Sequence, residues 1–167
     1  DCIDIARNND NQLFLNRQGG DGYHIAFIRD GSYKSFIATR SSAFCIDVNG
    51  SERVRIDSSG RVLIGTTTEG YSGGDDLTIS TSGDTGMTIR SGTSNQGTIA
   101  FADGTSGSDQ YRGFVQYFHN GDVLMFGTSA ANRLKIDSSG HFLPNADSTY
   151  NIGSNSVRFA NIYADTL

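Results

Sequence analysis

The chain has 167 residues, a formal net charge of −5 at pH 7, 21 glycines, one proline and no tryptophan. An acidic chain lacks the basic patch typical of nucleic-acid-binding proteins, and no apolar run is long enough to cross a membrane as a helix, so we expect neither role. Only 36% of the residues are hydrophobic, while ordering each residue costs about 1–2 kcal/mol. Such a thin core predicts that several copies of the chain associate.

Strand-like alternation and turn residues fill the first 65 positions. The dipeptides Asp30-Gly31 and Asn49-Gly50 are signals of tight hairpins, because the favoured two-residue turn needs φ > 0 at both positions. Strands are predicted over 2–7, 12–17, 23–29, 35–40 and 43–48, and a further hairpin over 53–63. We therefore interpret residues 1–65 as a first β-unit.

The rest of the chain divides into a loop and further strands. Residues 66–76 contain no aliphatic apolar side chain, which is typical of a linker or an exposed loop. A second β-unit is predicted over 77–143, with strands at 77–80, 87–90, 97–102, 112–118 and 123–128. The arm 112–118 carries large side chains on both faces, so we expect it to be covered on both sides. One helical turn at 156–159 is the only predicted helical element.

A pentapeptide indicates that the two units are related. Ile56-Asp57-Ser58-Ser59-Gly60 recurs unchanged as Ile136-Asp137-Ser138-Ser139-Gly140. Aspartate closes such turns by accepting hydrogen bonds from backbone amides, and glycine takes the φ > 0 position. The predicted structural turn residues are Asp57, Gly60, Asp137 and Gly140.

The repeat extends upstream of the pentapeptide. Ile25-Ala26-Phe27 recurs as Ile99-Ala100-Phe101, at a shorter offset than the pentapeptide. The second unit therefore carries about six extra residues, which we expect in a surface loop over 104–111. The predicted fold is all-β: two related antiparallel β-units, forming either a hairpin-rich sandwich or an intertwined trimeric β-structure, with a C-terminal cap strand. The cap segment is expected within 144–167.

No constellation of residues predicts an enzyme. His24, His119 and His141 lack the spacing of a metal site, and the oxygen-rich stretch 103–109 lacks the order of ligands of a calcium loop. Aspartates are abundant but lie mostly in turns, so no carboxylate pair stands out as a glycosidase site. We predict no catalytic residue, no metal and no cofactor. Cys2 and Cys45 are either lone thiols or one disulfide.

The end of the chain is its most specific stretch. Asp147-Ser148-Thr149-Tyr150-Asn151-Ile152-Gly153, followed by Arg158-Phe159-Ala160-Asn161-Ile162-Tyr163, resembles the segment of bacteriophage tail fibres and tailspikes that precedes an intramolecular chaperone of the endosialidase type. The family pattern has Asp in place of Asn151 and Trp in place of Phe159. The repeated Arg-x-x-Ile-Asp-Ser-Ser-Gly-x-x-Leu motif is also similar to one found in phage tail-fibre regions.

This resemblance implies a virion component. It implies a homotrimeric fibre that is assembled in the host cytoplasm, attached to other tail proteins, and matured with the help of the chaperone. The sequence ends at Leu167 before such a domain, so we expect the chaperone to have been removed or the chain to be truncated. The candidates for a shared trimer core are Ile136, Phe142, Ile152, Phe159 and Ile162. Burial of these side chains within their own chain stays open as an alternative.

Three functions fit a phage fibre. The first is adhesion to a host-surface glycan or protein, the second a purely structural shaft, and the third a polysaccharide-degrading tailspike. Receptor binding needs exposed aromatic rings beside amide, carboxylate and guanidinium groups. The candidate receptor-binding residues are Tyr71, Asp109, Gln110, Tyr111 and Arg112. For Tyr111 the alternative is that its ring packs on a neighbouring chain.

Overall fold

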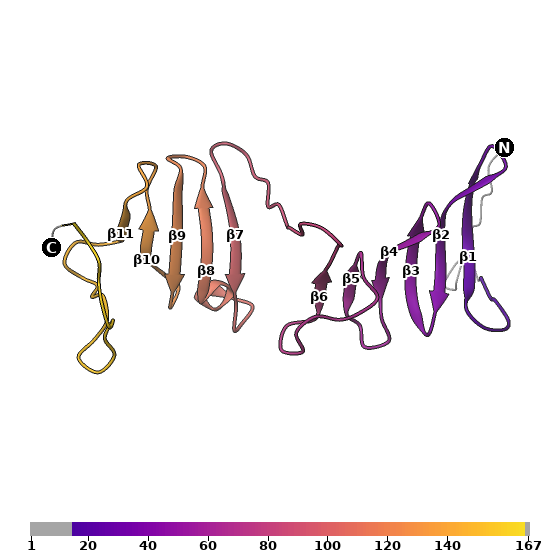
Figure 1. Cartoon of the computed structure of the whole chain (residues 1–167), viewed down its shortest axis with the longest axis horizontal. Coiled ribbons are helices and arrows are strands. Elements are labelled where there is room, and N and C mark those ends of the chain that lie inside the picture. The colour runs from indigo at the N-terminus through magenta and orange to yellow at the C-terminus, as the bar shows by residue number, and fades with distance from the viewer. Residues whose placement is uncertain (1–14, 166–167) are drawn as a thin grey trace. The chain divides into compact units, whose positions relative to one another are not determined.

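The computed structural model describes residues 15–165, and contacts divide the chain into two compact units with a boundary between Met87 and Thr88. Each unit contains one β-sheet, six-stranded in the first unit and five-stranded in the second (Figure 1). Among the described residues the only helical element is the short 3-10 turn η1 (Gly107–Tyr111). The all-β prediction is confirmed. Within the same residues, no helix is long and apolar enough to cross a membrane.

The first sheet follows the order of the sequence. Its strands are β1 (Gly22–Arg29), β2 (Ser32–Arg40), β3 (Ala43–Val48), β4 (Ser51–Ile56), β5 (Val62–Ile64) and β6 (Leu77–Ile79). Tight turns join β1 to β2, β2 to β3 and β3 to β4, and their central residues have positive φ, the conformation that right-twisted hairpins favour. Neighbouring strands are antiparallel except β5 and β6, which run parallel.

The second sheet is antiparallel throughout, in the order β11-β10-β9-β8-β7. Its strands are β7 (Gln96–Phe101), β8 (Gly113–Phe118), β9 (Val123–Thr128), β10 (Ala131–Ile136) and β11 (Phe142–Pro144). The turn η1 lies in the connection from β7 to β8. Residues 145–165 follow β11 as turns and irregular chain without a strand.

The two sheets share one pairing register. Phe44 on β3 lies opposite Ile56 on β4, and Leu124 on β9 lies opposite Ile136 on β10. Leu124 and Ile136 each lie 80 positions after their counterparts Phe44 and Ile56, and the same offset separates the two pentapeptides. The upstream match has equivalent pairing, because β1 and β7 bring Ile25 and Ile99 to the same place beside β2 and β8. Strands β1–β5 and β7–β11 are thus counterparts of one another.

The extra residues of the second unit lie in two places. Most are in the β7–β8 connection, around η1, where the first unit has only the Asp30-Gly31 turn. The others are in the turn 119–122 between β8 and β9, where the first unit has only Ser41 and Ser42. The sequence predicted the first place and missed the second, because Asn120-Gly121 on its own indicates a two-residue turn.

Strand β6 belongs to the first sheet, whereas the sequence-based division placed residues 77–80 in the second unit. The segment 66–76 is therefore a loop within the first unit, because it connects β5 to β6 and these two strands pair with each other. Its polar composition is what an exposed connection between strands requires, and composition alone does not distinguish such a loop from a linker between units.

Other local predictions also differ from the structure. Residues 87–90 are not a strand, residues 156–159 are not helical, and the C-terminal cap strand is absent from 145–165. Of the strand predicted over 12–17, residues 15–17 are irregular and the others lie outside the described residues, as does the strand over 2–7. Among the described residues, the arm 112–118 lies inside a single-layered sheet, and neither unit forms a sandwich of two sheets.

Candidate functional site

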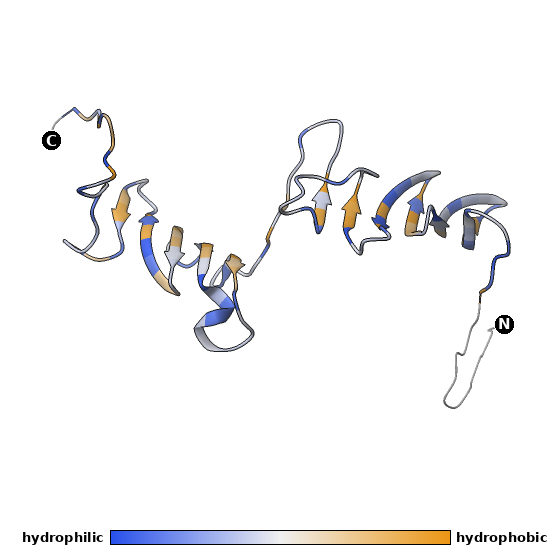
Figure 2. Cartoon of the chain, turned by 90° about the horizontal axis from the view of Figure 1, so that it is seen from below, coloured by the Kyte–Doolittle hydropathy of each residue, from blue (hydrophilic) through white to orange (hydrophobic). Residues whose placement is uncertain are grey.

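Each sheet has one continuous apolar face. Cross-strand partners share a face of a sheet, and one row of partners in the first sheet contains only Ile and Val: Ile25, Ile37, Ile46, Val54, Ile64 and Ile79. A second row on this face contains Phe44, Ile56, Val62 and Leu77. Figure 2 shows these hydrophobic bands alternating with hydrophilic ones along the strands.

The second sheet repeats this face. One row contains Ile99, Val115, Phe126, Leu134 and Pro144, and the next contains Tyr117, Leu124, Ile136 and Phe142. Phe101 and Phe142 are each 62% exposed, and Phe44 and Leu77 on the first sheet are exposed as well. No described element of the same unit forms a second layer over either face.

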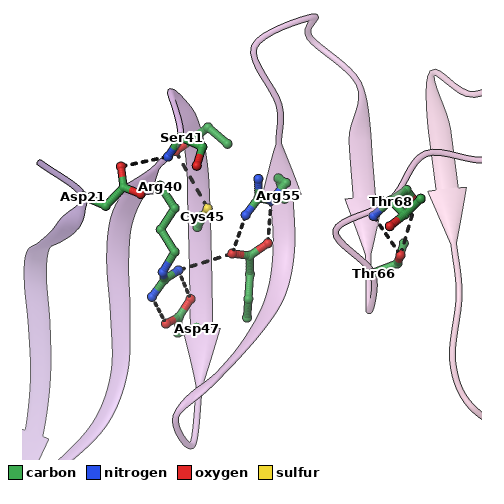
Figure 3. Close-up of polar contacts among 10 residues, drawn as sticks. Asp21, Arg40, Ser41, Cys45, Asp47, Arg55, Thr66 and Thr68 are labelled. Carbon is green, nitrogen blue, oxygen red and sulfur yellow. Dashed lines mark hydrogen bonds and ion pairs between the residues drawn. The ribbon is translucent and has the colours of Figure 1, made fainter.

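The opposite face of the first sheet, which we call its polar face, carries charged side chains above small buried apolar ones. Arg40 donates from Nη1 to Asp47 Oδ1 at 2.8 Å and to Glu52 Oε2 at 3.3 Å, and Arg55 Nε donates to Glu52 Oε1 at 2.6 Å (Figure 3). Asp47 is only 2% exposed, so its charge needs this partner. We call Arg40, Asp47, Glu52 and Arg55 the ion cluster.

Hydrogen bonds within the ion cluster shift the pKa values of Arg40, Glu52 and Arg55 in the direction of their charged forms. Hydrogen bonding to Asp47 raises the pKa of Arg40, against the opposing effect of burial. Hydrogen bonds from Arg55 lower the pKa of Glu52 in the same way. Beneath these side chains lies a small core of Ala38, Ala43 and Cys45, where burial raises the pKa of the Cys45 thiol. These shifts keep Arg40, Glu52 and Cys45 from changing charge near neutrality, which suits a structural role.

An aromatic stack completes the cover of this polar face. The Tyr23 ring lies parallel to the Phe36 ring with centroids 3.8 Å apart, and the guanidinium of Arg40 lies 5.7 Å from the centre of Tyr23. Stacking and cation–π contacts of this kind are each worth about 0.5–1.5 kcal/mol. The first sheet therefore has aromatic and charged side chains above β2 and β3, and its own hollow, of about 340 Å³, lies to one side of them, between Tyr23, Arg40 and the segment before β1.

The polar face of the second sheet contains a groove at the equivalent place. Its volume is about 480 Å³, and Gln96, Thr98, Tyr111, Phe114, Gln116, Phe118, Ala130 and Asn132 line it. Gln116 Nε2 donates to Thr98 Oγ1 at 2.7 Å across its floor. Every lining side chain is uncharged, unlike those of the ion cluster on the first sheet.

The two pentapeptide turns have the same geometry. Asp57 Oδ1 accepts hydrogen bonds from the backbone amides of Ser59 at 2.9 Å and Arg61 at 3.0 Å, and Asp137 Oδ1 accepts them from Ser139 and His141. Gly60 and Gly140 have φ of +86° and +85°. These are the roles that the sequence assigned to the two aspartates and the two glycines.

The candidate receptor residues do not form one cluster in the structure. Tyr71 lies in the 66–76 loop of the first unit and is 82% exposed. Asp109, Gln110 and Tyr111 belong to η1 and Arg112 follows it, all in the second unit. Gln110 is engaged locally, donating to the Thr105 carbonyl at 2.9 Å. Only Tyr111, which is 45% exposed, reaches the groove.

The candidate trimer-core residues are mostly unburied within their own chain. Phe142, Ile152, Phe159 and Ile162 are all exposed, and Ile136 is half-buried. Ile136 and Phe142 lie on the apolar face of the second sheet. The other three follow β11 in the segment without strands.

The ion cluster, the groove and the extent of the apolar faces were not predicted from the sequence. The signal that could have found part of them was the 80-position offset of the pentapeptides, which aligns Asp47 and Glu52 with Gly127 and Asn132. Among the described residues, no group of three or more His, Cys, Asp or Glu side chains could hold a metal ion.

Comparisons with known proteins give weak similarity only. No family model matches the chain, and the comparison with curated proteins finds no match. Among solved structures, the carboxy-terminal domain of the bacteriophage T5 L-shaped tail fibre aligns with 99% of this chain and 98% of its own, at 13% identity and a TM-score of 0.38. The same domain with its intra-molecular chaperone domain aligns with 98% of this chain and 67% of its own, at 12% identity and a TM-score of 0.35. Scores this low do not establish a shared fold.

Proposed function

We propose that this chain is the distal part of a trimeric phage tail fibre that attaches the virion to its host. The observation that carries the proposal is the pair of uncovered apolar faces, one on each sheet. The tail-fibre motifs of the sequence, above all 147–153 and 158–163, give the assembly its biological context.

The apolar faces need a cover. Burial of apolar surface contributes about 25 cal/mol per Å², and monomeric proteins rarely expose contiguous apolar patches larger than a few hundred Å². The row from Ile25 to Ile79 crosses all six strands of the first sheet, so the patch is as wide as the sheet. A second copy of the same chain supplies a matching apolar face without any further protein.

A threefold arrangement satisfies both faces of each sheet. Three equivalent sheets can turn their apolar faces toward a common axis and leave their polar faces in water, in a closed assembly with no unpaired copy. The ion cluster on the first sheet supports this orientation, because its charges are already paired within the chain and gain nothing from further burial. In this arrangement Ile136 and Phe142 lie in the shared core.

Sedimentation tests the assembly. The purified protein should sediment with about three times the chain mass of 17.9 kDa. Phe44→Asp places a charge on the apolar face and should shift the protein toward smaller species. Ser42→Asp is the matched control, because it adds the same charge in the adjacent turn at a positive φ that aspartate tolerates. A stable wild-type monomer would refute the trimer.

A purely structural shaft is the alternative function, and the tandem repetition of one sheet favours it. Adsorption of the labelled trimer to candidate host cells separates the two functions, because a shaft does not bind. Release of reducing ends from host polysaccharide by the same trimer would instead reveal a degrading tailspike.

A further inference from the structure

We propose that the groove on the polar face of the second sheet binds a neutral oligosaccharide. This inference rests on the proposed host-adhesion function and names its site and its ligand class. It follows from the differences between counterpart positions in the two sheets of the same chain.

Three counterpart pairs show how the groove arises. Tyr23, whose ring covers Phe36 in the first sheet, has Thr98 at its place beside β8. Arg40 corresponds to Phe118, since each is the last residue of its strand and lies opposite the first residue of the next. The second sheet therefore lacks both the covering ring and the arginine of the ion cluster.

The acidic half of the ion cluster is replaced as well. Asp47 corresponds to Gly127 and Glu52 to Asn132. Gly127 is required by the new packing, because a Cβ at this position would lie 2.0 Å from the Phe114 ring. Phe114 therefore lies flat over the strand and forms an apolar floor at the place where the first sheet has a buried carboxylate.

The residues specific to the second unit add functional groups to the groove. Gln116 replaces Ala38 and brings an amide that can both donate and accept hydrogen bonds. The insertion around η1 adds Tyr111, whose ring centroid lies 6.5 Å from that of Phe114. The extra residues of the second unit thus build one side of the groove.

The chemistry of the lining selects the ligand class. A volume of about 480 Å³ lies within the usual range of about 300–1,000 Å³ for small-ligand sites. Amide and hydroxyl groups from Gln96, Thr98, Gln116 and Asn132 suit a ligand with many hydroxyls, and aromatic rings suit the apolar face of a sugar ring. No charged side chain lines the groove, so a neutral sugar fits better than an acidic one.

The inference is tested by measuring how the assembled wild-type protein binds a panel of neutral hexose oligosaccharides. Uronic-acid oligosaccharides are measured beside them. We expect binding to at least one neutral member. Gln116→Ala should weaken this binding roughly threefold to tenfold, the effect of one lost hydrogen bond. Thr98→Tyr should abolish it, because the new ring would cover Phe114 on the groove floor as Tyr23 covers Phe36 in the first sheet.

Both substitutions introduce the side chain that the first sheet carries at the counterpart position, so the fold accommodates them. Thermal melting and sedimentation check this, and Thr93→Tyr, an exposed turn residue of the same unit outside the groove, is the control. Failure of every neutral oligosaccharide to bind, or wild-type affinity in Thr98→Tyr, would overturn the inference. Host adsorption by the same variants separates the two proposals: adsorption that Thr98→Tyr leaves intact overturns the groove and keeps the adhesion function.

Discussion

At the scale of single residues, the two pentapeptide turns depend on backbone conformation and on one carboxylate each. A Cβ on Gly60 or Gly140 would meet no atom within 4 Å, so space does not explain the need for glycine. The positive φ does, because it is the region that side chains with a Cβ avoid. The sequence predicted this conformation from the residue types of the turn alone.

The first prediction concerns these glycines. Gly60→Val and Gly140→Val should each lower the free energy of unfolding by on the order of 1–2 kcal/mol, the cost of forcing a β-branched residue into a positive φ. Urea unfolding of the assembled protein measures the change. Gly74→Val, at a glycine without positive φ and with nothing within 4 Å, is the control and should have a smaller effect. Equal effects at all three sites would contradict the explanation.

The second prediction concerns the carboxylate of Asp57. Burial opposes its ionisation, but hydrogen bonds from Arg61 and Ser59 outweigh burial and lower its pKa below the ordinary value of 3.8. A lowered folded-state pKa gives stability that is present above the unfolded-state pKa and is lost as the pH falls through the folded-state pKa. Asp57→Asn should therefore flatten the loss of stability below about pH 4, as measured by urea unfolding against pH. An unchanged acid profile would show that the carboxylate contributes nothing.

At the scale of elements, the first five strands of each sheet are counterparts, but the sixth strand exists only once. At the 80-position offset of the pentapeptides, β6 corresponds to Val157–Phe159. This segment has the same apolar-polar-apolar pattern and yet forms no strand. Strand β11 explains the difference. The backbone carbonyl of Ile64 accepts a hydrogen bond from the Ser80 amide, so the backbone groups of Ile64 face β6. The counterpart of Ile64 is Pro144, which has no N–H to donate to a further strand.

The third prediction concerns this edge. Pro144→Ile introduces the residue that the first sheet carries and restores the donor on the open edge of β11. Val157–Phe159 should then pair with β11 as β6 pairs with β5, and the amide of Ala160 should exchange more slowly with deuterium, since its counterpart Ser80 donates to Ile64. Hydrogen exchange measures this directly. If Ala160 exchanges at the wild-type rate, an influence other than the proline keeps the segment from pairing.

The elements also show what sequence patterns could and could not predict. Dipeptides such as Asp30-Gly31 predicted the hairpins because the turn itself requires those residues. The pairing of β6 was not predictable from composition, because parallel pairing across the 66–76 loop depends on contacts distant in sequence. The groove was missed for a related reason: it results from the side chains that Thr98 and Gly127 lack, and an absence leaves no motif.

At the scale of the whole molecule, the low apolar content of the sequence and the uncovered apolar faces of the sheets go together, because each unit contains one sheet only. Side chains alternate along β3, so Phe44 and Ile46 lie on the apolar face of the sheet, while Cys45 and Asp47 lie on the polar face. Within the described residues, the first sheet covers its polar face with the ion cluster, but neither unit has a second layer over its apolar face. The thin apolar inventory of the sequence predicts association, which stays a prediction, and the strand register identifies the apolar faces as the surface that association would cover.

The fourth prediction concerns the stability of the assembly. If association covers the apolar faces, folding and assembly are coupled, and the Tm rises with protein concentration by mass action. A tenfold increase in concentration should raise the Tm by about a few degrees, as measured by calorimetry at several concentrations. Phe44→Asp should lower the Tm most at low concentration, where dissociation is favoured, whereas Ser42→Asp should follow the wild-type curve. A Tm that is independent of concentration, in a protein that sediments as one chain, would mean that a single chain is stable with both apolar faces exposed to water.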